Sequence, residues 1–465
     1  MLYPKNQTEK LEKELFENPT SEYRAAPFWA WNCKLDKDKL LRQIEHLKEM
    51  GMGGYHIHAR NGLATEYLGT EFIDLVKACN EKGKQEGMLT WLYDEDRYPS
   101  GSAGGEVTKD REYSGRYLLF TPYPYWQAPK DKDLHILFSV PRQENGELLA
   151  RYLVELDDAG YLSSYRRLYE GENPAGRIWY AYLEINPQSP WFNMQTYADT
   201  MNRKAVERFI ELTHEKYYQA VGEEFGKSIP GIFTDEPQME GRGRLDFSRA
   251  RKDVTMPCTR DLTETFKKEY GYDFLDKLPE LYWELADGRL SPLRYHYHRH
   301  TNDRFYRAFF ETIGDWCASH HICFTGHLMS EQSLLGQYLR LGEAMRLYNA
   351  FQLPGIDILA DNHEYTTAKQ AQSVVRQKGL PGMLSELDGV TNWDYDFRGH
   401  KLQGDWQAAL GVTVRVPHLT WVSMEGEAKR DYPASIGYQS PWYREYNLIE
   451  DHFARVNTAL TRGKP

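Results

Sequence analysis

Apolar residues recur along this chain in eight short runs that have the pattern of β-strands. The runs cover residues 26–32, 53–60, 88–96, 229–237, 321–328, 355–362, 382–389 and 416–425. Amphipathic segments with the period of an α-helix lie between them. One such segment, residues 36–51, places Leu40, Ile44 and Leu47 on one stripe and ends at Gly51, a residue suited to a helix terminus. The alternation predicts an α/β fold of the (β/α)8 TIM-barrel type.

One stretch interrupts this alternation. Between residues 113 and 186, short β-type runs at 116–126, 134–140, 148–156 and 177–185 are separated by turn sequences. This pattern is typical of β-hairpins rather than of strand–helix units. The predicted organisation therefore has three parts, which are residues 1–112 with barrel strands 1 to 3, residues 113–186 as an inserted β-rich subdomain, and residues 187–465 with strands 4 to 8.

Composition and charge narrow the class of partner. The net charge is −11 and no dense tract of Lys and Arg occurs, so we expect neither a nucleic acid nor a membrane surface as a partner. The five cysteines are scattered without a Cys-x-x-Cys pair, which argues against a disulfide framework and a zinc knuckle. The N-terminal segment is charged where a secretory signal is apolar, so the expected location is the cytoplasm. The oligomeric state stays open.

Two glutamates stand out because each lies where a predicted strand ends. Glu236 belongs to the sequence Phe-Thr-Asp-Glu-Pro of the fourth strand, and Glu386 to Leu-Ser-Glu-Leu-Asp-Gly of the seventh. The C-terminal ends of barrel strands meet at one rim, so both side chains are expected at one site. Such a pair cleaves glycosidic bonds, because one carboxyl protonates the leaving oxygen while the other attacks the sugar or activates water. Asp235 is placed to raise the pKa of a general acid at Glu236.

The second strand carries polar side chains on one face. His56, His58 and Arg60 alternate with apolar residues, so they are expected to face the lumen. There they could bind sugar hydroxyl groups, or they could be buried and satisfied by neighbours. A second interpretation is a metal-dependent hydrolase, resembling the amidohydrolases, in which His56, His58, His327 and an aspartate hold the metal. A third is a non-catalytic sugar-binding barrel.

Aromatic and acidic residues complete the predicted rim. Aromatic residues make up 14% of the chain, and Trp31 or Trp393 could stack on a sugar ring. Asp94 and Asp96 could bind hydroxyl groups or ligate Ca²⁺, although no cofactor is expected to be required. The predicted catalytic residues are Glu236 and Glu386, and the predicted substrate-binding residues are Trp31, Asn32, His56, His58, Arg60, Asp94, Asp96, Asp235, His327, Asp361, Trp393 and His418.

Several longer motifs resemble those of a known enzyme family. They occupy residues 26–60, 91–105, 233–237, 342–359, 384–389 and 426–443. Together they are similar to the large bacterial glycosidases related to the α-L-rhamnosidases of glycoside hydrolase family 106. The resemblance implies a TIM barrel with Glu236 as acid and Glu386 as base, an inverting reaction, an active-site calcium in some members, and a glycoside or oligosaccharide substrate with a terminal rhamnose-like sugar. Glutamates on strands four and seven also occur in retaining barrel glycosidases, so the stereochemistry is open.

Overall fold

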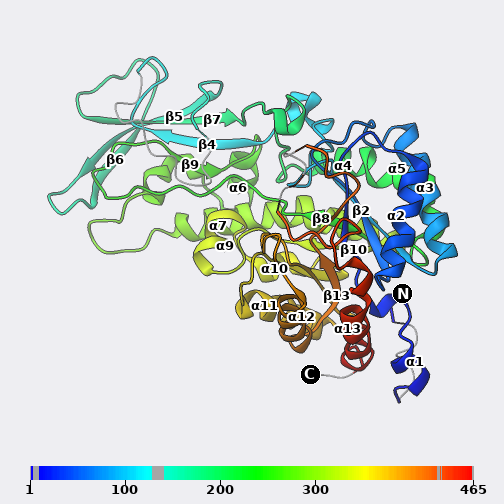
Figure 1. Ribbon diagram of the computed structural model, residues 1–465. Helices are drawn as coiled ribbons and strands as arrows, with labels where there is room; N and C mark the ends of the chain where they lie inside the picture. The colour runs from blue at the N-terminus through cyan, green and yellow to red at the C-terminus, as the bar shows by residue number, and fades with distance from the viewer. Residues whose placement is uncertain (1, 4–9, 128–140, 427–429, 431, 463–465) are drawn as a thin grey trace.

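A parallel sheet of nine strands forms the larger part of the molecule (Figure 1). The computed structural model describes residues 2–3, 10–127, 141–426, 430 and 432–462. The sheet curls into a TIM-barrel-like arrangement with helices around it, in the strand order β13-β12-β11-β10-β8-β3-β2-β1-β14. The strands are β1 (Phe28–Trp31), β2 (Gly54–Ala59), β3 (Leu89–Tyr93), β8 (Gly231–Asp235), β10 (Cys323–His327), β11 (Leu353–Ile358), β12 (Met383–Leu387), β13 (Val412–Pro417) and β14 (Thr420–Trp421).

The last predicted strand is divided into two pieces. β13 pairs with β12 while β14 pairs with β1, so the two pieces connect the ends of the strand order. The predicted start at residue 416 was wrong, because the strand begins at Val412. The polar residue Arg415 obscured the pattern in the sequence. It lies on the outer face of the strand, where it pairs with the buried Glu450 and covers the Phe453 ring. The other seven predicted runs all overlap strands of this sheet.

Helices cover the outer face of the parallel sheet (Figure 1). The segment predicted as a helix at residues 36–51 is confirmed as α2 (Lys37–Glu49), which begins where Asp36 accepts a hydrogen bond from the Lys39 amide and is followed by Gly51 at φ 82°. The other helices are α1 (Lys13–Glu17), α3 (Thr70–Gln85), α4 (Arg203–Leu212), α5 (His214–Val221), α8 (Thr312–Ser319), α9 (Leu334–Arg340), α10 (Ala344–Tyr348), α11 (Tyr365–Lys378), α12 (Phe397–Ala409) and α13 (Asn447–Leu460). None of the described helices is long and apolar enough to cross a bilayer.

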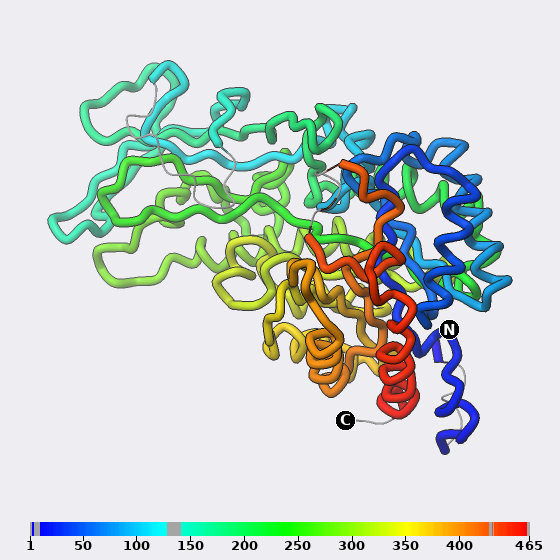
Figure 2. Tube along the Cα trace, viewed as in Figure 1, coloured from blue at the N-terminus to red at the C-terminus, as the bar shows by residue number. Residues whose placement is uncertain are grey.

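The β-type runs in residues 113–186 contribute to a second, antiparallel sheet. Its order is β6-β5-β7-β4-β9, and it extends away from the parallel sheet (Figure 2). Its strands are β4 (Arg116–Thr121), β5 (Glu147–Leu156), β6 (Leu162–Leu168), β7 (Arg177–Ile185) and β9 (Val254–Pro257). The fifth strand thus comes from chain that follows β8, beyond the predicted insertion. The predicted run at 134–140 lies outside the described residues.

The second sheet has its own hydrophobic core. Apolar side chains of β4, β5, β7 and β9 pack against α6 (Leu262–Tyr270), the 3-10 segment Phe274–Leu281 and α7 (Pro292–Phe305). A π-helical turn, Tyr306–Glu311, joins α7 to α8. The helices that follow β8 therefore serve both sheets, which the strand–helix alternation of the sequence did not indicate.

Candidate active site

The two predicted catalytic glutamates lie on either side of one buried histidine ring. Glu386 is in β12, and the ring nitrogen Nε2 of His327 donates a hydrogen bond of 2.7 Å to its Oε2. Glu236 follows the last residue of β8 with φ 45°, in the left-handed region that non-glycine residues rarely occupy. One of its carboxylate oxygens lies within 4.8 Å of a His327 ring nitrogen. The turn at Glu236 therefore brings its carboxyl to the lumen side of the rim.

His327 is held in its charged form by the acids around it. Burial disfavours the cation, but the hydrogen bond to Glu386 and the charges of Asp235 and Glu386 raise the pKa of His327 well above its usual value. Asp235 Oδ1 lies 3.6 Å from His327 Nε2, and its Oδ2 accepts a 2.7 Å hydrogen bond from the Tyr93 hydroxyl. These contacts fix both the orientation and the charge of the imidazole.

Glu236 has the properties of a proton donor. Burial, and then the neighbouring charge of Asp235, raise its pKa to about 8. At neutral pH the carboxyl of Glu236 is therefore protonated.

Glu386, in contrast, has the properties of an ionised carboxylate. Burial favours its neutral form, but the hydrogen bond and charge of His327, together with His418 and Arg60, lower its pKa below the usual value. His418 Nε2 lies 3.9 Å from Glu386 Oε1. Two neighbouring carboxyls whose environments move their pKa values apart form a pattern typical of acid and base assignments in enzymes. The arrangement can supply a proton from Glu236 and an anion at Glu386.

The histidines of β2 lie deeper in the lumen. His56 Nδ1 donates to the Ala26 carbonyl at 2.8 Å, and its ring stacks on Trp91. The His58 ring stacks on Tyr93, with 4.0 Å between ring centroids. Burial lowers the pKa of both, that of His56 to about 3. These neutral rings support the floor of the site.

Trp31 and Asn32 hold the fold together and do not line the site. Strand residues alternate between faces, and Trp31 faces the helices, where it is buried against Trp29 and Phe72. Asn32 exchanges two hydrogen bonds with the backbone of Ser423 and so ties β1 to the segment after β14. The predictions of sugar contact at these two positions are corrected accordingly.

The predicted roles of Asp94 and Asp96 also need correction. Because Tyr93 faces the lumen, Asp94 faces the helices, where it accepts a 2.6 Å hydrogen bond from the Ser100 hydroxyl and lies 4.0 Å from His214 on α5. Asp96 pairs with Arg97 at 2.8 Å in the loop after β3. Neither carboxylate is part of a group with metal-ligand spacing among the described residues.

Asp361 and Trp393 lie on loops outside the buried cluster. β11 ends at Ile358, and Asp361 is exposed and accepts a 2.9 Å hydrogen bond from Gln403. It lines a small surface cavity of about 430 Å³. Asp361 therefore does not join the cluster around Glu386, contrary to the prediction. Trp393 is 50% exposed and lies against Trp421, with 5.6 Å between ring centroids. Its ring is accessible for stacking.

The sequence interpretation missed three acids near the rim, of which Asp357 is half-buried and Glu331 and Glu95 are buried. Asp357 of β11 lies opposite Glu386 in the strand register, a position that residue spacing along β11 could have indicated. Glu331, in the loop after β10, is buried, and burial raises its pKa to about 7. Glu95 accepts hydrogen bonds from the backbone amides of residues 96 and 101–104 and thereby anchors the loop after β3. No pattern in the sequence indicates that Glu331 and Glu95 are buried.

One group of side chains among the described residues has metal-ligand spacing, namely Glu236, His327 and Asp357. It offers two carboxylates and one imidazole nitrogen, whereas calcium takes six to eight oxygen ligands. His56 and His58 are not part of the group. The structure therefore does not assemble the ligand set of the predicted metal-dependent alternative.

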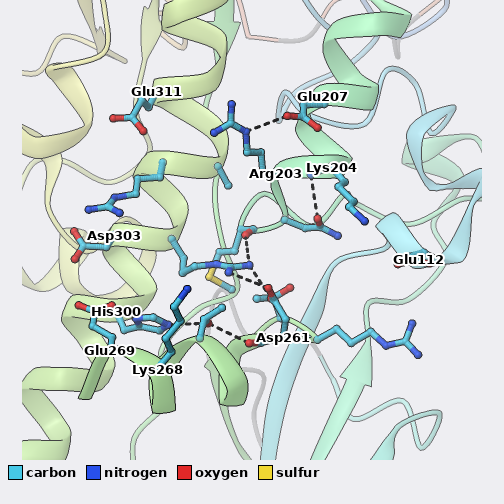
Figure 3. A pocket seen from close by; sticks show the side chains of 18 residues that line it. Glu112, Arg203, Lys204, Glu207, Asp261, Lys268, Glu269, His300, Asp303 and Glu311 are labelled. Atoms are coloured by element: carbon cyan, nitrogen blue, oxygen red, sulfur yellow. Dashed lines mark hydrogen bonds and ion pairs between the residues drawn. The ribbon is translucent and has the colours of Figure 1, made fainter. Parts of the chain in front are cut away.

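A large cavity is lined by other residues than those of this cluster (Figure 3). It has a volume of about 1080 Å³ and is lined by charged residues of α4, α6 and α7. Many of these charges pair with one another, as in Arg304 with Asp261 at 2.7 Å and Arg203 with Glu207 at 3.0 Å. Glu236 and Glu386 are not among the residues that line this cavity.

Comparison of the structure with solved structures identifies similar folds. A rhamnosidase from Novosphingobium sp. PP1Y superposes with a TM-score of 0.65 and 12% identity, covering 97% of this chain and 60% of that chain. A β-galactosidase from the haloarchaeon Halorubrum lacusprofundi has a TM-score of 0.49 and 11% identity, covering 93% and 58%. At these identities the fold alone is shown, and it rests on the rhamnosidase. The chain spans about 60% of that protein's length. No family model and no curated protein matches the sequence.

Proposed function

We propose that this protein is a glycoside hydrolase that removes a terminal sugar, an α-L-rhamnoside or a related one, from an oligosaccharide or glycoside. The observation that carries the proposal is the opposite shift in the pKa values of Glu236 and Glu386 around His327. A pair of carboxyls, one neutral and one ionised, is what the cleavage of a glycosidic bond requires.

In this proposal the parallel sheet is a (β/α)8 barrel, and residues 113–186 belong to a domain inserted after its third strand. The similarity of fold to the rhamnosidase structure supports the choice of sugar class. The exposed Trp393 ring supplies a stacking surface at the entrance of the site.

In the proposed reaction each side chain has its own role. Glu236 transfers its proton to the glycosidic oxygen as the bond to the anomeric carbon breaks. Glu386, kept ionised by His327, faces the positive charge that develops on the sugar. It then attacks that carbon directly or takes a proton from an attacking water molecule. Asp235 and Tyr93 hold His327 in place during these steps.

A panel of p-nitrophenyl glycosides tests the proposal. We expect release of nitrophenol from the α-L-rhamnoside or a closely related sugar, and the same rate after dialysis against EDTA, because the proposed roles of Glu236 and Glu386 require no metal. The Glu386→Gln protein, purified identically, controls for contaminating glycosidases. Activity that EDTA abolishes and zinc restores would favour the metal-dependent alternative. Sugar binding without hydrolysis of any glycoside would favour the non-catalytic one.

The pH dependence of kcat/KM should reflect the ionisation of both Glu236 and Glu386. The pKa of Glu236 is raised to about 8, so kcat/KM for a disaccharide should fall above that pH as Glu236 loses its proton. The pKa of Glu386 is lowered, so activity should persist into moderately acidic solution before Glu386 is protonated. The measurement is kcat/KM between about pH 4 and 10. An alkaline limb of equal size for an activated aryl glycoside, which needs little protonation, would assign that limb to another group.

A further inference from the structure

Asp357 is a half-buried acid of β11 to which the proposed reaction assigns no role. Its Cα is paired in the parallel register with that of Glu386, and residues paired in this way point to the same face of a sheet. Its carboxylate lies within 4.8 Å of atoms of both Glu236 and His327. Asp357 therefore faces the space where the scissile sugar must sit.

The carboxyl of Asp357 has unused capacity for hydrogen bonding. Its Oδ1 atom is buried and has no hydrogen-bond partner in the part of the chain that the structure describes. Buried polar atoms in native proteins nearly always have a partner, which can be a ligand. Since the neighbouring Glu236 and His327 are engaged in the reaction, the partner of Asp357 is expected to come from the substrate.

The surroundings of Asp357 favour its neutral form. Burial, then Glu386 on the neighbouring strand, raise its pKa well above the usual value, as do Glu236 and Glu331, while His327 acts in the opposite direction. A neutral carboxyl presents one O–H donor and a carbonyl acceptor. A sugar hydroxyl can satisfy either of them.

We propose that Asp357 binds a ring hydroxyl group of the sugar held between Glu236 and Glu386, and that it thereby contributes to the selection of the sugar. The inference rests on the proposed glycosidase function and adds a specificity-determining residue to it. The amide of asparagine has the same shape and offers a carbonyl acceptor and an NH2 donor group, so it can replace a neutral carboxyl but not a carboxylate that must be charged.

The test compares Asp357→Asn with Asp357→Ala. We expect Asp357→Asn to retain kcat/KM within about threefold, and Asp357→Ala to lose roughly 10- to 100-fold, the effect of one buried hydrogen bond. Asp315→Asn, the same change at an exposed position on α8, controls for the substitution itself. Thermal unfolding of each variant shows whether the fold is intact.

Monodeoxy aryl glycosides identify the hydroxyl group. One deoxy position should slow the wild-type enzyme and cause no further loss in Asp357→Ala, since the two changes remove the same contact. Additive losses at every position would overturn the inference. So would an Asp357→Asn protein as impaired as Asp357→Ala, because that result would require a charged carboxylate.

Calorimetric titration with free monosaccharides separates this inference from the proposed function. Binding that weakens in Asp357→Ala and persists in Asp357→Asn supports the contact even if no glycoside is hydrolysed, in which case the proposed hydrolysis alone fails. Hydrolysis together with monosaccharide binding that neither variant alters would refute the inference alone.

Discussion

Replacement of Glu236 by glutamine is expected to slow hydrolysis of a disaccharide by roughly 10² to 10⁴-fold. Glutamine has the shape of the acid but cannot transfer a proton, and a sugar is a poor leaving group. A dinitrophenyl glycoside departs with little protonation, so its hydrolysis should be nearly unchanged. The measurement is kcat/KM for the two aglycones on the same sugar.

Glu240→Gln is the matched control for this experiment, because Glu240 follows the same strand and undergoes the same chemical change. It should behave as the wild type does. Equal losses for the two aglycones in Glu236→Gln would show that Glu236 is not the general acid. Asp235, or Glu240 if its own replacement lowers activity, would then be the candidate acid.

Replacement of Glu386 by glutamine should depress both aglycones together, by at least ~10³-fold. The ionised carboxylate is needed whichever group departs, since it acts on the anomeric carbon or on water. The charged His327 ring would also lose the negative charge of the carboxylate to which it is hydrogen-bonded. Ser385→Ala changes the adjacent residue on the opposite face of β12 and should retain activity.

The anomeric configuration of the first product released shows whether Glu386 acts as nucleophile or as base. Proton NMR of the product during the first turnovers distinguishes retention, in which Glu386 is the nucleophile, from inversion, in which it is the base. Substantial disaccharide hydrolysis by Glu386→Gln would contradict both roles. Asp357 would then be the remaining candidate on the neighbouring strand.

Strand positions and lumen-facing side chains could be predicted from the sequence because they depend on local patterns. The period-2 alternation of β2 places His56, His58 and Arg60 in the barrel, and the strand-end positions of Glu236 and Glu386 indicate a shared rim. The same rule, applied at single-residue precision to β1 and β3, would have excluded Trp31 and Asp94. An error of one or two residues in a predicted strand boundary was enough to hide which side chains face the lumen.

The composition of the site was decided by the tertiary structure. Asp357 rather than Asp361 reaches Glu386, because β11 ends at Ile358 and the parallel register fixes which residue lies opposite. β9 joins the second sheet from a part of the chain far from β4 in sequence.

The sequence by itself determined that two glutamates would meet at one rim of an α/β barrel. The resemblance of its motifs already implied that Glu236 is the acid and Glu386 the base, and the structure supplies the physical reason for the two different pKa values. A pKa depends on burial and on neighbouring charges, and here those charges come from β8, β10 and β12, from the loops after β2 and β10, and from the chain between β13 and β14. The spacing of residues along the sequence does not show which of these charged side chains face the His327 ring.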